Sequence, residues 1–423
     1  MNTIVRKSAL IGEEYHETVL DNGLKILVCP KKDYASSYAL FGTRYGSIDT
    51  RFKLGGEAEF TEVPEGIAHF LEHKLFESEE GDVFARYAET GASANAYTSF
   101  DRTCYLFSCS SDFERSFDIL LDFVQSPYFT RETVEKEQGI IGQEIRMYDD
   151  TASWRVFFNL LTALYHKHPV RVDIAGTAES IAKIDADLLY RCYNTFYNPA
   201  NMFVCAAGNV DPQKILEMVE AKIKPHDPIE IIRASHDEPR EVRTPKTEQK
   251  LAVAMPLFAL GYKEDCAAPQ KTVRERAASE LLLDAAAGSA SPLYKSLFDD
   301  GLINNTFETE YFYGHYHAAA ILSGESKDPD AVRARIGAEF ERLRREGLSD
   351  EAFENSRRKL YGHAVMRMGN VEAAANALVQ CAFAGEGLFD EAESYHTLTK
   401  AEVLSRLEAL SGERSALSVI NPA

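Results

Sequence analysis

Two histidines four positions apart, with a glutamate directly before the second, form the pattern His-x-x-Glu-His between His69 and His73. Residues i and i+4 of a helix lie one turn apart on the same face, so both side chains could present an imidazole nitrogen to one metal ion. A catalytic zinc ion usually takes three protein ligands and keeps a fourth position for water. The sequence therefore predicts a third ligand, an Asp or Glu, on a neighbouring element.

The stretch RETVEKEQGIIGQEIRMYDD offers two candidate carboxylates, Glu137 and Glu144. Thr130 is a suitable N-cap, and acidic residues in the first turns followed by spaced apolar residues predict a helix from this point. Glu137 and Glu144 lie two helical turns apart and so face the same way. One of them could bind the metal while the other supports it, and the spacing alone leaves both assignments open.

Glu72 lies next to His73 and one turn from His69, which places it beside the metal rather than on it. There it could take a proton from a water molecule and pass it to a leaving amine, as peptide hydrolysis requires. A metal ion that only stabilised the fold would be coordinated by four protein ligands with no position left for water, and the sequence offers no fourth Cys or His near either helix. The other histidines considered as ligands lie in stretches with other assignments; they are His166, His168, His315 and His317.

The composition of the 423-residue chain indicates a globular protein of two domains. No apolar run is long enough to span a membrane, and the first residues lack the apolar segment of a signal peptide. The formal net charge of −20, without a basic cluster, argues against a nucleic-acid partner. Seven scattered cysteines without a Cys-x-x-Cys pair are expected to be reduced thiols, so we expect a cytoplasmic protein.

Strand and helix signals follow the same order in the two halves of the chain. Asn22 and Gly23 between two apolar runs predict a β-hairpin near the start, and MFVCAAG predicts a buried strand near the end of the first half. A polar, proline-containing stretch from 224 to 250 is typical of a connector. We therefore expect a zinc-binding domain over 1–223, a linker over 224–250 and a second domain over 251–423.

The second half of the chain aligns with the first half at an offset of 219 positions. With this offset Thr130 falls on Ser349, and the capped helix after Thr130 matches LSDEAFENSRRKLYGHA. The pattern predicts an α+β protein of two duplicated α/β domains, each a mixed β-sheet with helices packed on it. Because the second copy has no His-x-x-Glu-His motif and no carboxylates at the matching helix positions, we expect it to be structural or substrate-binding; Ser356 and His363 replace Glu137 and Glu144.

The stretch HFLEHKLFE, followed by EKEQGIIGQEI, resembles the pitrilysin family of zinc peptidases with the inverted motif, which includes insulin-degrading enzyme and the mitochondrial processing peptidase. Other stretches that resemble the family are LDNGLKILV, GASANAYTSFDRTCYLF, HPVRVDIAGTAESI and FYNPANMFVCAAGNV. The resemblance covers most of residues 15–215, whereas the second half is similar only in its general pattern. The chain is identified as a short, two-domain member of bacterial type.

The resemblance implies a role for each residue at a matching position. It implies a zinc-dependent endopeptidase in which Glu72 is the base that activates a water molecule and Glu137 orients a ligand histidine. The implied zinc ligands are His69, His73 and Glu144. An edge strand that pairs with the substrate backbone is implied at Asn95, Ala96, Tyr97 and Thr98.

The resemblance also implies how much of the working enzyme this chain supplies. Family members enclose an unfolded peptide between four such domains, and this chain holds two, which is half of the clamshell. Short members work as homodimers or with a similar-sized sister chain that lacks the zinc motif. The alternative function is a non-catalytic structural or partner subunit, but such members typically lose the histidines or the central glutamate, and all five positions are filled here.

Overall fold

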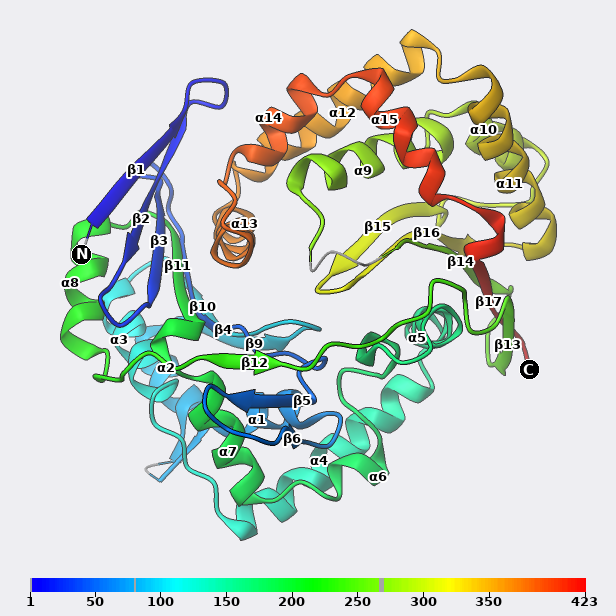
Figure 1. Ribbon diagram of the computed structural model, residues 1–423. Coiled ribbons are helices and arrows are strands. Elements are labelled where there is room, and N and C mark those ends of the chain that lie inside the picture. The colour runs from blue at the N-terminus through cyan, green and yellow to red at the C-terminus, as the bar shows by residue number, and fades with distance from the viewer. Residues whose placement is uncertain (1, 80, 266–269) are drawn as a thin grey trace. The chain divides into compact units, whose positions relative to one another are not determined.

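The computed structural model describes residues 2–79, 81–265 and 270–423. The chain divides into two compact units, and each unit is assembled from segments that are not continuous in sequence. Unit 1 comprises Met1–Ile145, Asp173–Ser235 and Val365–Phe389, and unit 2 comprises Arg146–Val172, His236–Ala364 and Asp390–Ala423. Figure 1 shows the helices and strands of both units.

Unit 1 is built on a seven-stranded mixed sheet in the order β1-β2-β3-β11-β4-β10-β9. β11 runs parallel to β3, and the other pairs are antiparallel. Two small sheets, β12-β5-β6 and β7-β8, complete the strands of this unit. The strands are β1 (Asn2–Ser8), β2 (Glu13–Val19), β3 (Lys25–Pro30), β4 (Ser37–Thr43), β5 (Arg51–Leu54), β6 (Thr61–Glu62), β7 (Glu77–Ser78), β8 (Gly81–Asp82), β9 (Ser93–Thr98), β10 (Thr103–Cys109), β11 (Met202–Gly208) and β12 (Ile231–Arg233).

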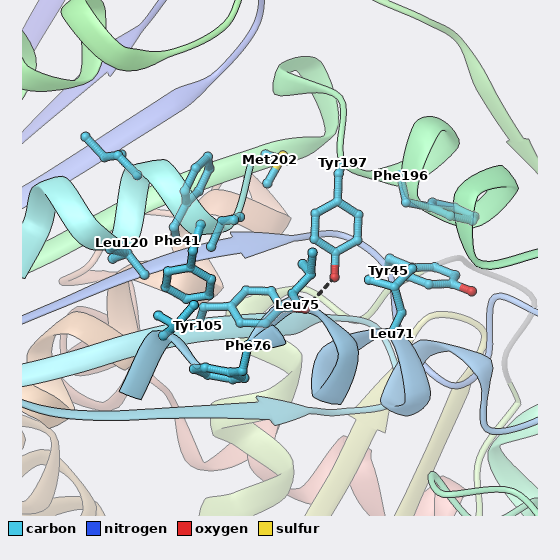
Figure 2. Close-up of a cluster of buried hydrophobic side chains, with 14 of the residues drawn as sticks. Phe41, Tyr45, Leu71, Leu75, Phe76, Tyr105, Leu120, Phe196, Tyr197 and Met202 are labelled. Carbon is cyan, nitrogen blue, oxygen red and sulfur yellow. Dashed lines mark hydrogen bonds between the residues drawn. The ribbon is translucent and has the colours of Figure 1, made fainter. Parts of the chain in front are cut away.

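Alternating side chains of the large sheet enter two separate hydrophobic cores, as the period of two along a strand requires. On β4, Ala39 and Phe41 enter the first core, whereas Tyr38 and Leu40 enter the second. Figure 2 shows part of the first core, where the Tyr105 and Tyr197 hydroxyls are hydrogen-bonded at 2.8 Å.

Helices cover both faces of this sheet. The first core is closed by α1 (Ile67–Leu75), α2 (Val83–Thr90), α3 (Phe113–Phe123), α4 (Arg131–Asp149), α6 (Ala178–Ile181), α7 (Ala186–Phe196) and α8 (Pro212–Lys222), and the second by α13 (Val371–Ala384). A short 3-10 helix, η2 (Pro199–Asn201), precedes β11.

Unit 2 is built on a five-stranded sheet in the order β13-β17-β14-β16-β15. Gly261 on β14 approaches Leu160 and Leu164 of α5, and the next residue, Tyr262, contacts Phe340 of α11, so the two helices cover opposite faces. The strands are β13 (Lys246–Leu251), β14 (Leu257–Lys263), β15 (Glu308–Gly314), β16 (His317–Glu325) and β17 (Ser415–Pro422). The helices are α5 (Ala152–Leu164), η1 (Pro169–Arg171), α9 (Val273–Ala287), α10 (Pro292–Asp299), α11 (Pro329–Glu346), α12 (Asp350–Arg367), α14 (Asp390–Thr397), α15 (Lys400–Ser405), η3 (Arg406–Ala409) and η4 (Gly412–Arg414).

The two sheets share one topology. The order β3-β11-β4-β10-β9 in unit 1 matches β13-β17-β14-β16-β15 in unit 2, with the single parallel pair at the same end. α4 begins at Arg131 and α12 at Asp350, 219 positions later, and α5 and α13 begin with the same offset. The predicted α+β fold with two duplicated domains is therefore confirmed.

The helices α4 and α12 each carry the chain out of the unit in which they start. α4 begins in unit 1 and leads into α5, which packs on β14 and β17 of unit 2. α12 begins in unit 2 and leads into α13, which packs on β3, β4 and β11 of unit 1. Each sheet is thus covered on one face by a helix from the other half of the chain.

The expected hairpin and the expected free thiols are present in the described residues. The hairpin at Asn22 and Gly23 joins β2 to β3, and Gly23 takes the positive φ of 89° that such a turn needs. The six described cysteines are buried free thiols, and Cys266 lies outside the described residues. The stretch 224–250 contains β12 and begins β13. Among the helices that the structure describes, none is long and apolar enough to cross a membrane.

Candidate metal centre

The helix that carries His-x-x-Glu-His is held rigidly in unit 1. α1 begins after Gly66, whose φ of 89° is a left-handed conformation that L side chains rarely adopt. A Cβ at this position would also collide with the carbonyl oxygen of Ala175. Phe70 and Leu71 are fully buried in the first core. Because one side of α1 is locked in the core, its other side presents His69, Glu72 and His73 in a fixed orientation.

Three donor groups converge beside α1. His69 Nε2 lies 3.7 Å from Glu144 Oε1, and His73 Nε2 lies 3.5 Å from Glu144 Oε2. Within the described part of the chain, these three residues form the group whose geometry could hold a metal ion, with donor atoms all within 4.8 Å of one another. Both separations exceed hydrogen-bond length. Two atoms each about 2.1 Å from a tetrahedral zinc ion lie about 3.4 Å apart, so the spacing fits a shared cation.

Glu137 takes a different position from Glu144, although both lie on the same side of α4. Its Oε1 lies 2.9 Å from His73 Nδ1, and its carboxylate is buried. The N–H of Nδ1 can donate a hydrogen bond to this carboxylate, and in the neutral ring the Nε2 lone pair then faces Glu144. The structure thus separates the two carboxylates that the sequence left equivalent: one faces both imidazoles, and the other contacts only the far side of His73.

The two histidines have different electrostatic surroundings. Burial and the neighbouring His73 lower the pKa of His69 to about 3, so this imidazole is neutral at physiological pH. Burial also opposes the charged form of His73, but the hydrogen bond to Glu137 and the nearby carboxylates outweigh it and raise the pKa of His73. The surroundings of His69 therefore keep a lone pair available for a cation, while negative charge gathers around His73.

Glu72 lies beside the three converging residues without belonging to their group. Its carboxylate is buried, and Thr98 Oγ1 donates a hydrogen bond to Oε2 at 2.7 Å. Burial raises the pKa of Glu72, while the hydrogen bond from Thr98 and the proximity of His73 oppose the rise. A buried carboxylate next to the imidazoles has the position and the raised basicity that proton transfer needs.

Three of the four residues expected to pair with substrate make side-chain hydrogen bonds of their own. They lie on β9, which is an edge strand of the seven-stranded sheet. Asn95 is exposed and its Oδ1 accepts from the N–H of Ala96 at 2.9 Å, whereas Tyr97 donates to Asn376 Oδ1 on α13 at 3.3 Å. The Thr98 side chain contacts Glu72, a link that sequence reasoning missed. The alternation along β9 predicts that residues 94, 96 and 98 lie on one face, but it does not predict which side chain of α1 they contact.

A second feature that sequence reasoning missed joins α1 to α4. Lys74, the residue after the motif, is completely buried and forms an ion pair with Glu77. Glu77 also lies 3.4 Å from Nζ of Lys136, which precedes Glu137 on α4. The three charges hold the end of the histidine helix against the helix that carries both carboxylates.

Two family models match the chain. Residues 53–178 match the model described as insulinase, peptidase family M16, and residues 183–360 match the model described as the peptidase M16 inactive domain. The first match contains all the residues around the metal centre, and the second begins after them.

Similar proteins and structures extend over the full chain. The Bacillus subtilis protein YmfH, named an uncharacterized zinc protease, is 42% identical over 414 residues, which is 96% of each chain. A crystal structure described as that of an M16-like peptidase from Alicyclobacillus acidocaldarius has a TM-score of 0.92 at 35% identity and covers 100% of this chain and 99% of its own. Pitrilysin shares the fold with a TM-score of 0.76 at 17% identity; the match covers 100% of this chain and 46% of the pitrilysin chain.

Proposed function

The chain belongs to peptidase family M16, the insulinase and pitrilysin family, and from this premise we propose that it is a zinc-dependent endopeptidase acting on peptides or extended polypeptide segments. The observation that carries the proposal is the convergence of His69, His73 and Glu144 with the buried carboxylate of Glu72 beside them. The names of the relatives, zinc proteases, support the choice of zinc.

His69, His73 and Glu144 would hold the metal, because two imidazoles and one carboxylate match the ligand set of catalytic zinc. A bound Zn²⁺ supplies Lewis acidity and lowers the pKa of a coordinated water molecule to roughly 7. Glu137 keeps the ring of His73 oriented and its proton on Nδ1 through the 2.9 Å contact.

Glu72 would be the general base. It accepts a proton from the attacking water and delivers it to the amine nitrogen as the C–N bond breaks. General acid–base catalysis of this kind contributes about 100- to 10,000-fold to the rate.

The open edge of β9 would bind the substrate as an added strand. Main-chain hydrogen bonds give affinity without requiring a particular sequence, so we expect broad selectivity. We further propose that the chain is half of an enclosed chamber and works as a homodimer or with a sister chain lacking the motif. The second duplicated domain, 251–423, would then be structural or substrate-binding.

The second candidate function is a non-catalytic partner subunit. It is favoured by the match of residues 183–360 to a domain described as inactive, although that match excludes the metal centre. Metal analysis and peptide cleavage by the wild-type protein and by Glu72→Gln distinguish the two functions. An enzyme retains zinc in both proteins and loses at least 100-fold of its turnover in the variant.

The matched control is Glu132→Gln, which makes the same change at an exposed position on α4 and should leave turnover unchanged. A wild-type chain that binds zinc and cleaves no peptide, alone or as a dimer, would support the partner subunit. If Glu72→Gln keeps more than half of wild-type turnover, Glu72 is not the base.

A further inference from the structure

We propose that Thr98 is the residue that holds Glu72 in its working position, and that it thereby links the strand on which a peptide binds to the group that moves the proton. The inference deepens the proposed function and rests on it. Its direct evidence is the 2.7 Å hydrogen bond from Thr98 Oγ1 to Glu72 Oε2, which joins β9 to α1.

The strand period decides which side chains of β9 face α1. Ala94 and Ala96 pack against the first core, on the α1 side of the sheet, whereas Tyr97 packs against the second core. Thr98 has the same parity as Ala94 and Ala96 and therefore also points toward α1. Of these three residues, Thr98 is the one whose side chain can donate a hydrogen bond to a carboxylate.

The main chain of Thr98 takes part in the same contact, because a backbone hydrogen bond from Thr98 acts together with the side-chain hydrogen bond to oppose the raised pKa of Glu72. The N–H of Ser99 donates to the carbonyl of Arg102 at 2.7 Å, which makes these two residues a hydrogen-bonded pair at the end of the hairpin. Hydrogen-bonded and non-hydrogen-bonded pairs alternate along an antiparallel ladder, and Thr98 is paired with Thr103. Thr98 and Thr103 are thus a non-hydrogen-bonded pair, so the N–H and C=O of Thr98 point away from β10.

A contact between the two threonines agrees with this assignment. Side chains approach more closely in non-hydrogen-bonded pairs, and Thr98 Oγ1 lies 3.4 Å from Thr103 Oγ1. Thr103 is completely buried and donates its own proton to the carbonyl of Tyr45 at 2.9 Å. The Thr98 hydroxyl is therefore held between a fixed oxygen in the sheet and the carboxylate of Glu72, and its β-branched side chain has few alternative rotamers.

This arrangement gives Thr98 a role that an ordinary β-forming residue would lack. A peptide that pairs with the edge of β9 would lie along the strand whose last residue holds Glu72. The scissile bond and the base would then both be positioned by β9, and a misplacement of about 1 Å at such a site can cost about 100-fold in rate. If Thr98 served only to form the strand, valine should preserve kcat, because both residues are β-branched and favour strands.

The test compares Thr98→Val, which removes the hydroxyl and keeps the shape, with Thr98→Ser, which keeps the hydroxyl. Ser108→Ala on β10 is the control, because it removes a hydroxyl from the neighbouring strand on the face opposite to Thr103. We expect all variants to bind one zinc ion per chain. Thr98→Val should lose about 10- to 100-fold in kcat with KM changed by less than about twofold, and Thr98→Ser should recover to within about threefold of wild type.

A second readout does not depend on activity. In a crystal structure of the metal-free Thr98→Val protein, the Glu72 carboxylate should leave its wild-type position while α1 and β9 stay in place. The inference is overturned if that carboxylate does not move, if Thr98→Val keeps more than half of wild-type kcat, or if Thr98→Ser is as impaired as Thr98→Val. A wild-type protein that binds zinc without cleaving peptides overturns the proposed function itself, and the role of Thr98 in it.

Discussion

Replacing each of the two carboxylates of α4 by its amide should have effects on zinc affinity that differ in size. Glu144 faces both imidazoles at 3.5 and 3.7 Å, so Glu144→Gln removes one of three proposed ligands and its negative charge. Glu137 contacts only His73 Nδ1, at 2.9 Å, so Glu137→Gln leaves three ligands in place. We expect Glu144→Gln to bind no zinc at stoichiometric concentrations.

The expected loss for Glu137→Gln follows from its single buried contact. Residues that orient a ligand histidine typically contribute 10- to 100-fold to metal affinity, which corresponds to about 1.4 to 2.7 kcal/mol. Glutamine keeps an acceptor oxygen but loses the charge that favours the proton on Nδ1, so the loss should lie toward the lower end. Glu132→Gln, exposed on the same helix, should not change zinc affinity.

Competition with a chromophoric chelator measures the zinc dissociation constant of each variant, and unfolding in urea shows whether the variants remain equally stable. If Glu137→Gln releases zinc and Glu144→Gln retains it, the two roles are exchanged. Equal losses in both variants would contradict the separation of the carboxylates by their distances to the imidazoles.

Three further predictions concern the start of α1, a buried histidine of unit 2 and the binding of substrate. Gly66→Ala should destabilise the protein by more than about 2 kcal/mol in urea unfolding and weaken zinc binding, because its φ is 89° and a Cβ there would collide with the carbonyl oxygen of Ala175. Gly139→Ala should stabilise the protein by roughly 0.5 to 1 kcal/mol, because the helix leaves open space for a Cβ at this position. Burial lowers the pKa of His168 to about 2, so the unfolded chain binds one more proton between about pH 6.5 and pH 2 and stability falls as pH decreases in that range. His168→Asn should reduce that slope by up to about 1.4 kcal/mol per pH unit, and an unchanged slope in urea unfolding at pH 4 to 6 would contradict the assignment. Finally, N-methylation of single amides near the scissile bond of a cleaved peptide should raise KM at alternate positions, and no effect at any position would exclude strand addition.

The local parts of this structure follow from short-range patterns in the sequence. The turn at Asn22 and Gly23, the helix that begins at Arg131 and the buried strand β11 each depend on residues within a few positions of one another. The 219-residue repeat was also visible, because the same pattern of caps and apolar positions occurs twice. Patterns of this length predict elements and their order, and thus the duplicated α+β fold.

Contacts between distant residues were not determined in this way. The sequence placed Glu137 and Glu144 on one face of a helix, but the packing of α4 against α1 decided that Glu144 faces both imidazoles. The buried charge of Lys74, which pairs with Glu77 beside that contact, is likewise revealed by no local pattern. Periodicity specifies the direction in which a side chain leaves its own helix or strand. Which residue that side chain contacts depends on how separate helices and strands pack.

The sequence by itself determined the chemistry that is possible here, since two histidines and a glutamate at helical spacing can present metal-binding and proton-accepting groups together. Only the tertiary structure decided that Thr98 contacts Glu72 and that α13 covers the sheet of unit 1. The physical reason is the range of the interactions: caps, turns and hydrophobic periodicity act over a few residues, whereas strand order and the contact between Thr98 and Glu72 come from packing, which joins residues far apart in the chain.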